Sequence, residues 1–135
     1  QDWLLLPFDL EDFRQRVIPK VNYATPPKTL IDAVHQALLP HLHLPDLNND
    51  MAAELCSFDT RTLGRKLKAK GTTISREIAK LRKEQASRLL KHSRQSISDV
   101  ANAVGFSDPS VFSRAFKRWT GFTPREYRSA NNREQ

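Results

Sequence analysis

Arginine and lysine side chains recur at matched positions in two stretches of the sequence that lie 49 residues apart. Each stretch carries an arginine followed three residues later by a lysine, Arg65 with Lys68 and Arg114 with Lys117. The planar guanidinium group of an arginine can bond O6 and N7 of one guanine together, whereas a lysine ammonium is a point charge suited to phosphate. Since the same residue types return at the same register, we interpret the pairs as a surface for nucleic acid rather than an ordinary solvated face.

Both stretches belong to an internal repeat, which pairs residues 50–68 with residues 99–117 without gaps at an offset of 49. The identical pairs are Asp50/Asp99, Ala52/Ala101, Asp59/Asp108, Arg65/Arg114 and Lys68/Lys117. Each copy is predicted to form a short helix, a turn, an aspartate N-cap and a second helix. That order is the helix-turn-helix pattern.

Prolines, glycines and short polar side chains mark the predicted ends of the other elements. Helices are expected at 10–18 behind Asp9, at 29–39 behind a capping box of Thr29 and Asp32, and at 74–92, with an extended connector at 21–28 and a loop at 40–49. In the second copy the signals are Ser96 with Asp99, Gly105 in the turn, Asp108 before Pro109, and Thr123 with Glu126. The buried face of the long helix is predicted to follow Ile74, Ile78, Leu81, Gln85 and Leu89.

The second helix of each copy has two unlike faces. At about 100° per residue, Phe112, Phe116 and Trp119 form one narrow stripe, and Leu63 and Leu67 form its counterpart in the first copy. The opposite faces carry Arg61, Arg65 and Lys68 in the first copy, and Ser110, Arg114 and Lys117, flanked by Ser113 and Arg118, in the second. We expect the apolar stripes to lie in a core, which leaves the basic faces open to a groove.

Composition indicates a polyanionic partner and a reducing compartment, and it excludes a membrane-spanning segment. The net charge is +7, yet residues 61–94 alone hold twelve Lys and Arg against two Glu, which favours a polyanionic partner. A single cysteine, Cys56, excludes an intrachain disulfide and fits a reducing compartment such as the cytoplasm. The longest apolar run, 3–8, is too short to span a membrane. The chain starts with Gln1 and is expected to be a fragment of a longer protein.

Two segments resemble a known family. The segment SDVANAVGFSDPSVFSRAFKRWTGFTPREYR, residues 98–128, is similar to the second helix-turn-helix of the AraC/XylS family of bacterial transcription regulators. The segment MAAELCSFDTRTLGRKLKAKG, residues 51–71, is similar to the first. Arg82, Ala86, Leu89 and Leu90 match the connecting helix, so that the resemblance covers about residues 29–130.

The resemblance implies an all-α fold of about seven helices, in which two three-helix helix-turn-helix subdomains are joined by a long helix. The implied domains are a connector or tail of an upstream domain at 1–28 and a DNA-binding domain at 29–131, divided into 29–72, a linker helix at 73–93, and 94–131. The implied function is that of a sequence-specific DNA-binding transcription regulator, an activator located in the bacterial cytoplasm at the nucleoid. Its recognition helices, about 60–70 and 109–120, are expected to enter adjacent major grooves.

The resemblance also implies the residues that meet DNA. The base-contacting candidates are Arg61, Gly64, Arg65, Ser110, Val111, Ser113 and Arg114. The phosphate-contacting candidates are Lys68, Lys117, Arg118, Thr60, Arg76 and Arg125. Gly64 has no side chain where the family usually places a polar one, so it offers only a close approach of the backbone. No cofactor, metal or catalytic residue is implied.

The expected partners are double-stranded DNA, with two half-sites about one turn apart, and RNA polymerase. One chain carries both recognition helices, so this fragment is expected to bind as a monomer, with dimerisation left to the full-length chain. The predicted linker helix of nineteen residues is about 28 Å long, comparable to the roughly 34 Å between successive major grooves on one face.

Three other functions remain open from the residues alone. A nonspecific or architectural DNA binder would use the same basic segment without base contacts. A metal-dependent or hydrolytic enzyme would need His35, His41 and His43, but these lack metal-motif spacing, and we assign them to the surface or to helix ends. A protein-interaction module is compatible with DNA binding.

Overall fold

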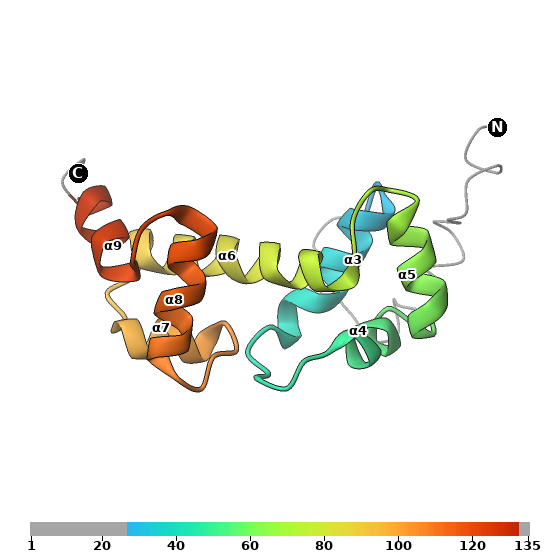
Figure 1. Cartoon of the computed structure of the whole chain (residues 1–135), viewed down its shortest axis with the longest axis horizontal. Helices are drawn as coiled ribbons and strands as arrows, with labels where there is room; N and C mark the ends of the chain where they lie inside the picture. The colour runs from blue at the N-terminus through green and yellow to red at the C-terminus, as the bar shows by residue number, and fades with distance from the viewer. Residues whose placement is uncertain (1–26, 133–135) are drawn as a thin grey trace. The chain divides into compact units, whose positions relative to one another are not determined.

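The computed structural model of the chain describes residues 27–132 (Figure 1). The predicted helix at 10–18 and most of the predicted connector at 21–28 lie outside this range. Within it the structure is all helical, as the sequence predicts, and contains no strand. Its elements are α3 (Leu30–Leu38), the 3-10 helix η1 (Leu39–His41), α4 (Asn49–Leu55), α5 (Thr60–Lys68), α6 (Ile74–His92), α7 (Ile97–Ala103), α8 (Pro109–Thr120) and α9 (Pro124–Asn132). None of them has the length and apolarity that a membrane-spanning helix needs.

The described residues divide into two compact units. The first unit holds residues 27–41 and 47–79, and the second holds residues 42–46 and 80–132. Helix α6 contributes its first turns to the first unit and the rest to the second. The short segment 42–46 lies between α3 and α4 in the sequence and yet packs with the second unit. The subdomain boundaries predicted at 72/73 and 93/94 stay predictions.

In the first unit, α3, α4, α5 and the start of α6 enclose an aliphatic core. Helix α3 begins at a capping box, in which the Thr29 hydroxyl accepts a hydrogen bond from the Asp32 N–H at 3.0 Å. The Asp32 carboxylate reaches one residue further back and accepts the Lys28 N–H at 3.1 Å. The fully buried side chains of this core are Leu30, Ala33, Val34, Ala37, Leu38, Ala52, Ala53, Cys56, Leu63 and Leu67.

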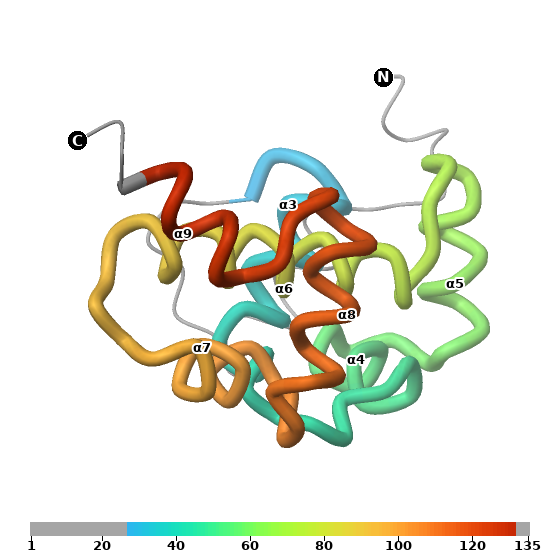
Figure 2. Tube along the Cα trace, turned by 60° about the vertical axis from the view of Figure 1, so that its left-hand side comes forward, coloured from blue at the N-terminus to red at the C-terminus, as the bar shows by residue number. Residues whose placement is uncertain are grey.

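The second unit is built around aromatic rings. Figure 2 follows the trace of α7, α8 and α9, and α8 packs against both of the other helices. Phe112 and Phe116 of α8 are completely buried, and their neighbours include Phe106 and Trp119. The Phe106 ring centroid lies 5.5 Å from that of Phe112 and 5.9 Å from that of Trp119, distances typical of favourable tilted and edge contacts. The predicted stripe is therefore a core, with Trp119 half-buried at its edge.

Helix α6 begins and ends at the predicted residues, but its buried face differs from the predicted one. Ile74, Ile78 and Leu81 are buried as expected. Beyond them Gln85 and Leu89 are only half-buried, and the buried positions are Ala86 and Leu90. The prediction continued one helical stripe along the whole length of the helix. Since α6 serves two units in succession, its buried face changes along its length.

The gap-free repeat is wrong in the first helix and turn of each copy. The N-caps and bounds of α4 and α7 differ by 48 residues, so that Ala53, not Ala52, is the counterpart of Ala101. Equivalent turn hydrogen bonds prove this register: Phe58 N–H to Ala53 C=O at 2.9 Å, and Phe106 N–H to Ala101 C=O at 2.8 Å. These are the long bonds of a Schellman motif, which requires a residue of positive φ just before the donor.

That positive-φ residue is Ser57 in the first copy, with φ of 61°, and Gly105 in the second, with φ of 89°. The sequence alignment instead placed Cys56 opposite Gly105. The second copy holds one extra residue, Ser107, between the turn and the following N-cap. From Asp59 and Asp108 onward the offset of 49 is correct, because both aspartates are N-caps.

Candidate nucleic-acid interface

Helix α5 is fixed at its start by an aspartate. The Asp59 carboxylate accepts the Thr62 N–H at 2.7 Å and the Thr62 hydroxyl at 3.0 Å. The bond from the Thr62 N–H holds the pKa of Asp59 below its ordinary value, because it favours the charged form. The helix ends at Lys68, two residues before the predicted end at 70. After it, Gly71 has a φ of 81°, and the Thr72 N–H donates to the Leu67 carbonyl.

One side of α5 is buried and the other is open. Leu63 and Leu67 are completely buried, as predicted. Arg61, Arg65 and Lys68 are exposed together on the other side. Gly64 lies among them, and a methyl group added to its Cα would have no other atom within 4 Å. Gly64, which is half-buried, therefore has open space beside its Cα between the arginines.

Thr60, a predicted phosphate contact, is tied to the preceding helix. Its hydroxyl donates to the Asp50 carboxylate at 2.5 Å, and the residue is half-buried. The hydroxyl hydrogen is therefore committed within the protein, although the oxygen can still accept a bond. Arg76, in the first turn of α6, is exposed in the same unit.

Helix α8 of the second unit, like α5, begins at an aspartate N-cap. The Asp108 carboxylate accepts the Ser110 N–H at 2.8 Å, and Pro109 occupies the first helical position, as predicted. Gly121, with φ of 85°, ends the helix, and its N–H bonds the Lys117 carbonyl at 2.7 Å. Each end of α8 is thus defined by a local hydrogen bond.

The open side of α8 carries the predicted residues of the second copy. The exposed ones are Ser110, Val111, Arg114, Lys117 and Arg118, with Ser113 half-exposed beside them. Val111 is one of only three large apolar side chains that are exposed within residues 27–132, with 41% of its surface accessible. Arg125, at the start of α9, is also exposed. The candidates on α8 thus share one open side of that helix, and Arg125 is exposed in the same unit.

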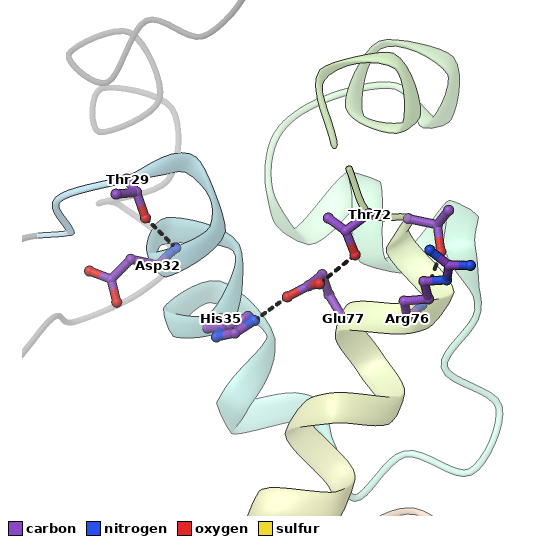
Figure 3. A network of polar contacts seen from close by, with 7 residues as sticks. Thr29, Asp32, His35, Thr72, Arg76 and Glu77 are labelled. Atoms are coloured by element: carbon purple, nitrogen blue, oxygen red, sulfur yellow. Dashed lines mark hydrogen bonds and ion pairs between the residues drawn. The ribbon is translucent and has the colours of Figure 1, made fainter. Parts of the chain in front are cut away.

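His35 is paired with a carboxylate from another helix. Figure 3 shows His35 of α3 facing Glu77 of α6, with 2.6 Å between Nε2 and Oε1. Thr72 donates to the other carboxylate oxygen of Glu77 at 2.6 Å. The side chains of His35 and Glu77 are only 18% and 6% exposed. His35 lies in the last turn of α3, at a helix end as predicted, but its contact with Glu77 was not part of the prediction. A signal was present in the sequence, because Glu77 interrupts the apolar face between Ile74 and Ile78.

The remaining histidines form no site. His41 is half-buried and His43 is exposed. Within residues 27–132, no three His, Cys, Asp or Glu side chains are grouped so that they could hold a metal ion.

Sequence reasoning also missed a contact centre around Arg82. Its Nη2 donates to the Leu44 carbonyl at 3.0 Å, and its Cζ lies 5.7 Å from the centroid of the Phe106 ring. Burial lowers the pKa of Arg82 from its usual range. The match of Arg82 to the connecting helix was noted, but its partners lie 38 residues upstream and 24 residues downstream, where no local pattern indicates them.

Known proteins resemble this chain in sequence and in fold. A family model described as a helix-turn-helix domain matches residues 51–130. Over 88 residues, 64% of this chain, the sequence is 40% identical to the HTH-type transcriptional activator RhaS of Escherichia coli O1:K1. The matched segment spans only 32% of the length of that relative.

Two solved structures share the fold. The DNA-binding domain of AdpA, a global transcriptional factor, in complex with a target DNA, is 27% identical, with a TM-score of 0.67 over 80% of this chain and 97% of that one. A transcriptional regulator of Chromobacterium violaceum, described as AraC-type DNA-binding domain-containing, is 26% identical, with a TM-score of 0.62 over 76% and 95%.

Proposed function

The chain belongs to the AraC/XylS family of helix-turn-helix proteins, and on that premise we propose that it is a sequence-specific DNA-binding transcription regulator. One observation carries the proposal. Helices α5 and α8 each begin at an aspartate cap, bury one apolar stripe, and leave a basic side open. A helix held in this way can enter a major groove, whose width admits an α-helix with its side chains.

On the open sides, the arginines are proposed to bond base edges. Arg61, Arg65 and Arg114 have the planar fork that fits O6 and N7 of guanine. Val111 suits the methyl group of a thymine, because it is apolar and exposed. Ser110 and Ser113 supply hydroxyl groups, and Gly64, with open space beside its Cα, permits a close approach of the helix backbone. The proposed phosphate contacts are Thr60, Lys68, Arg76, Lys117, Arg118 and Arg125.

We further propose that one chain occupies two successive major grooves. Helix α6 has nineteen residues and is therefore about 28 Å long, comparable to the groove spacing of roughly 34 Å. The two half-sites should differ in sequence, because the side chains on α5 and α8 differ. Inserting about five base pairs between the halves turns the second groove to the far side of the duplex, so affinity should fall to that of one half plus backbone contacts.

The proposal is tested first by selection from randomised duplexes, followed by equilibrium binding to the selected and a scrambled duplex at several salt concentrations. A sequence-specific regulator prefers the selected duplex by roughly 10³-fold or more at physiological salt. Both DNA classes show a salt slope, because phosphate contacts release counterions in each. A salt slope with equal affinities would favour the architectural alternative and refute specific regulation.

The remaining functional assignments are part of the same proposal. Activation of transcription, as in the name of the E. coli relative, implies contact with RNA polymerase bound beside the site. A cytoplasmic location at the nucleoid and the absence of catalysis follow from the same role. Transcription from a template that carries the selected site, with purified RNA polymerase, should rise when the chain is added. Unchanged or reduced transcription would argue against activation by this part of the protein.

A further inference from the structure

Arg82 joins three segments of the second unit at one guanidinium group. It projects from α6, its Nη2 donates to the Leu44 carbonyl in segment 42–46 at 3.0 Å, and its Cζ lies 5.7 Å from the Phe106 ring centroid. Phe106 lies in the turn between α7 and α8. A single side chain thus links the connecting helix, the upstream segment and the helix-turn-helix turn.

The backbone at Gly105 also lies close to Arg82 and to segment 42–46. A methyl group added there would lie 2.4 Å from the Leu42 carbonyl oxygen and 2.7 Å from Arg82 Nη2. The turn therefore approaches segment 42–46 and the guanidinium as closely as a residue without a side chain allows. Any displacement of Arg82 removes a neighbour of the turn itself.

From the turn the contact continues into α8. The Phe106 ring packs on Phe112 and on Trp119, whose centroids lie 5.5 Å and 5.9 Å away. Phe112 is completely buried and lies on the side of α8 opposite Arg114. The position of the Phe106 ring therefore affects the rotation of α8 about its own axis. That rotation sets the direction in which the exposed side chains of α8 point.

The surroundings of the Arg82 guanidinium are unfavourable for a charged group. Its Nε is buried without a hydrogen-bond partner, and no carboxylate pairs with it among residues 27–132. Burying a charged donor without a partner is costly. A hydrocarbon side chain would fill the same space without that cost, but it could neither bond the Leu44 carbonyl nor attract the face of Phe106 as a cation.

We propose that Arg82 is a positioning residue for α8, which holds the α7–α8 turn against segment 42–46 and so sets the angle at which the open side of α8 meets DNA. The proposal rests on the proposed function, since it assigns a role in base discrimination to a residue that does not touch the bases. It limits that role to the half-site contacted by α8.

The test measures mismatch penalties, each the ratio of Kd for a duplex with one changed base pair to Kd for the selected site. The half-site beneath the second unit is located by cleavage from an iron chelate attached to Ser129→Cys. Ser129 is an exposed residue of α9, whereas the natural Cys56 is buried. One changed base pair typically lowers specific affinity by roughly 5- to 150-fold. Penalties are determined separately in each half for the wild-type chain, Arg82→Met, Arg82→Lys and Arg88→Met.

In Arg82→Met the penalties in the α8 half should fall at least about threefold, because contact side chains must be held within about 0.5 Å and 10–20° to discriminate. Penalties in the α5 half should be unchanged. Arg82→Lys should give intermediate values, since it keeps one donor but loses the planar group. Arg88→Met, an exposed arginine on the same helix, should match the wild type in both halves.

The proposal is overturned if Arg82→Met keeps the wild-type penalties in the α8 half. It is also overturned if the penalties fall equally in both halves in step with a lower melting temperature, because Arg82 then only stabilises the fold. If Arg82→Met shows no cooperative melting above the assay temperature, Arg82→Lys decides by the same criterion. A wild-type chain without penalties in either half would refute the proposed function instead.

Discussion

Gly105→Ala is expected to destabilise the second unit far more than Gly121→Ala, although the two glycines have nearly the same backbone conformation. Their φ values are 89° and 85°. The difference lies in their surroundings, since a methyl group at Gly121 would have no other atom within 4 Å, whereas one at Gly105 would lie 2.4 Å from the Leu42 carbonyl oxygen. The pair therefore separates the cost of a left-handed backbone from the cost of a collision.

The magnitude follows from the two costs. An alanine in the left-handed region costs roughly 1–2 kcal/mol, and the stiffer unfolded chain offsets about 0.4–1 kcal/mol of that. Gly121→Ala should therefore lower the free energy of unfolding by about 1 kcal/mol. At Gly105, carbon and oxygen must move apart to about 3.3 Å, the shortest ordinary contact. That shift breaks the bond from Arg82 to Leu44, and a hydrogen bond from a charged group contributes roughly 1.5–3 kcal/mol.

Gly105→Ala should thus cost about 2–4 kcal/mol in total. The assay is urea denaturation followed by circular dichroism, with wild type, Gly105→Ala and Gly121→Ala measured side by side. The change in the free energy of unfolding is the change in midpoint multiplied by the slope, about 1–3 kcal/mol per molar urea. If the two variants differed by less than about 0.5 kcal/mol, the close approach at Gly105 would contribute nothing, and the reasoning would be refuted.

Three further predictions concern the helices that carry the basic faces. Gly64→Ala should raise the melting temperature, because alanine in a helix interior with open space is favoured by about 1 kcal/mol; a lower melting temperature would reveal an unseen contact. Arg114→Ala should relax discrimination at one or two base pairs by roughly 1–3 kcal/mol, whereas Lys117→Ala should weaken all duplexes alike and reduce the salt slope by about 1. If Arg114→Ala weakened binding to all duplexes equally, Arg114 would contact phosphate and not a base. The pKa of Asp59 is lowered by the Thr62 N–H, so its contribution to stability is present above the ordinary value of 3.8 and is lost as the pH falls through the lower folded value. Between pH 7 and pH 3, the melting temperature of Asp59→Asn should therefore depend less on pH than that of the wild type. An equal pH dependence in both would contradict the role of the Asp59 carboxylate as N-cap.

Much of the fold was predictable because its signals are local. The aspartate caps of α5 and α8, the capping box of Thr123 and Glu126, and the ends of α6 depend on residues within one turn of each other. The buried stripes of α5 and α8 were equally accessible, since helical periodicity alone places them opposite the basic residues. The base and phosphate contacts stay predictions, because they depend on a partner.

The offset of the repeat shows where local reasoning stops. Ala52 and Ala53 are adjacent and identical, and the identical pair Asp50/Asp99 favoured Ala52 as the counterpart of Ala101. The choice is made by the turn, in which Ser57 takes a positive φ although it is not a glycine. Such a conformation is uncommon for serine, and it is held by the hydrogen bonds that close the turn.

Only the tertiary structure decided which distant groups meet. His35 and Glu77 are 42 residues apart, and Leu44 is 38 residues from Arg82. No periodicity or cap relates such pairs, because their distance depends on how helices pack after they form. The sequence by itself therefore determined the helices, their caps and their two-faced character, all of which arise within a few residues. Packing alone decided that α6 changes its buried face between two cores, and that segment 42–46 joins the unit of Arg82.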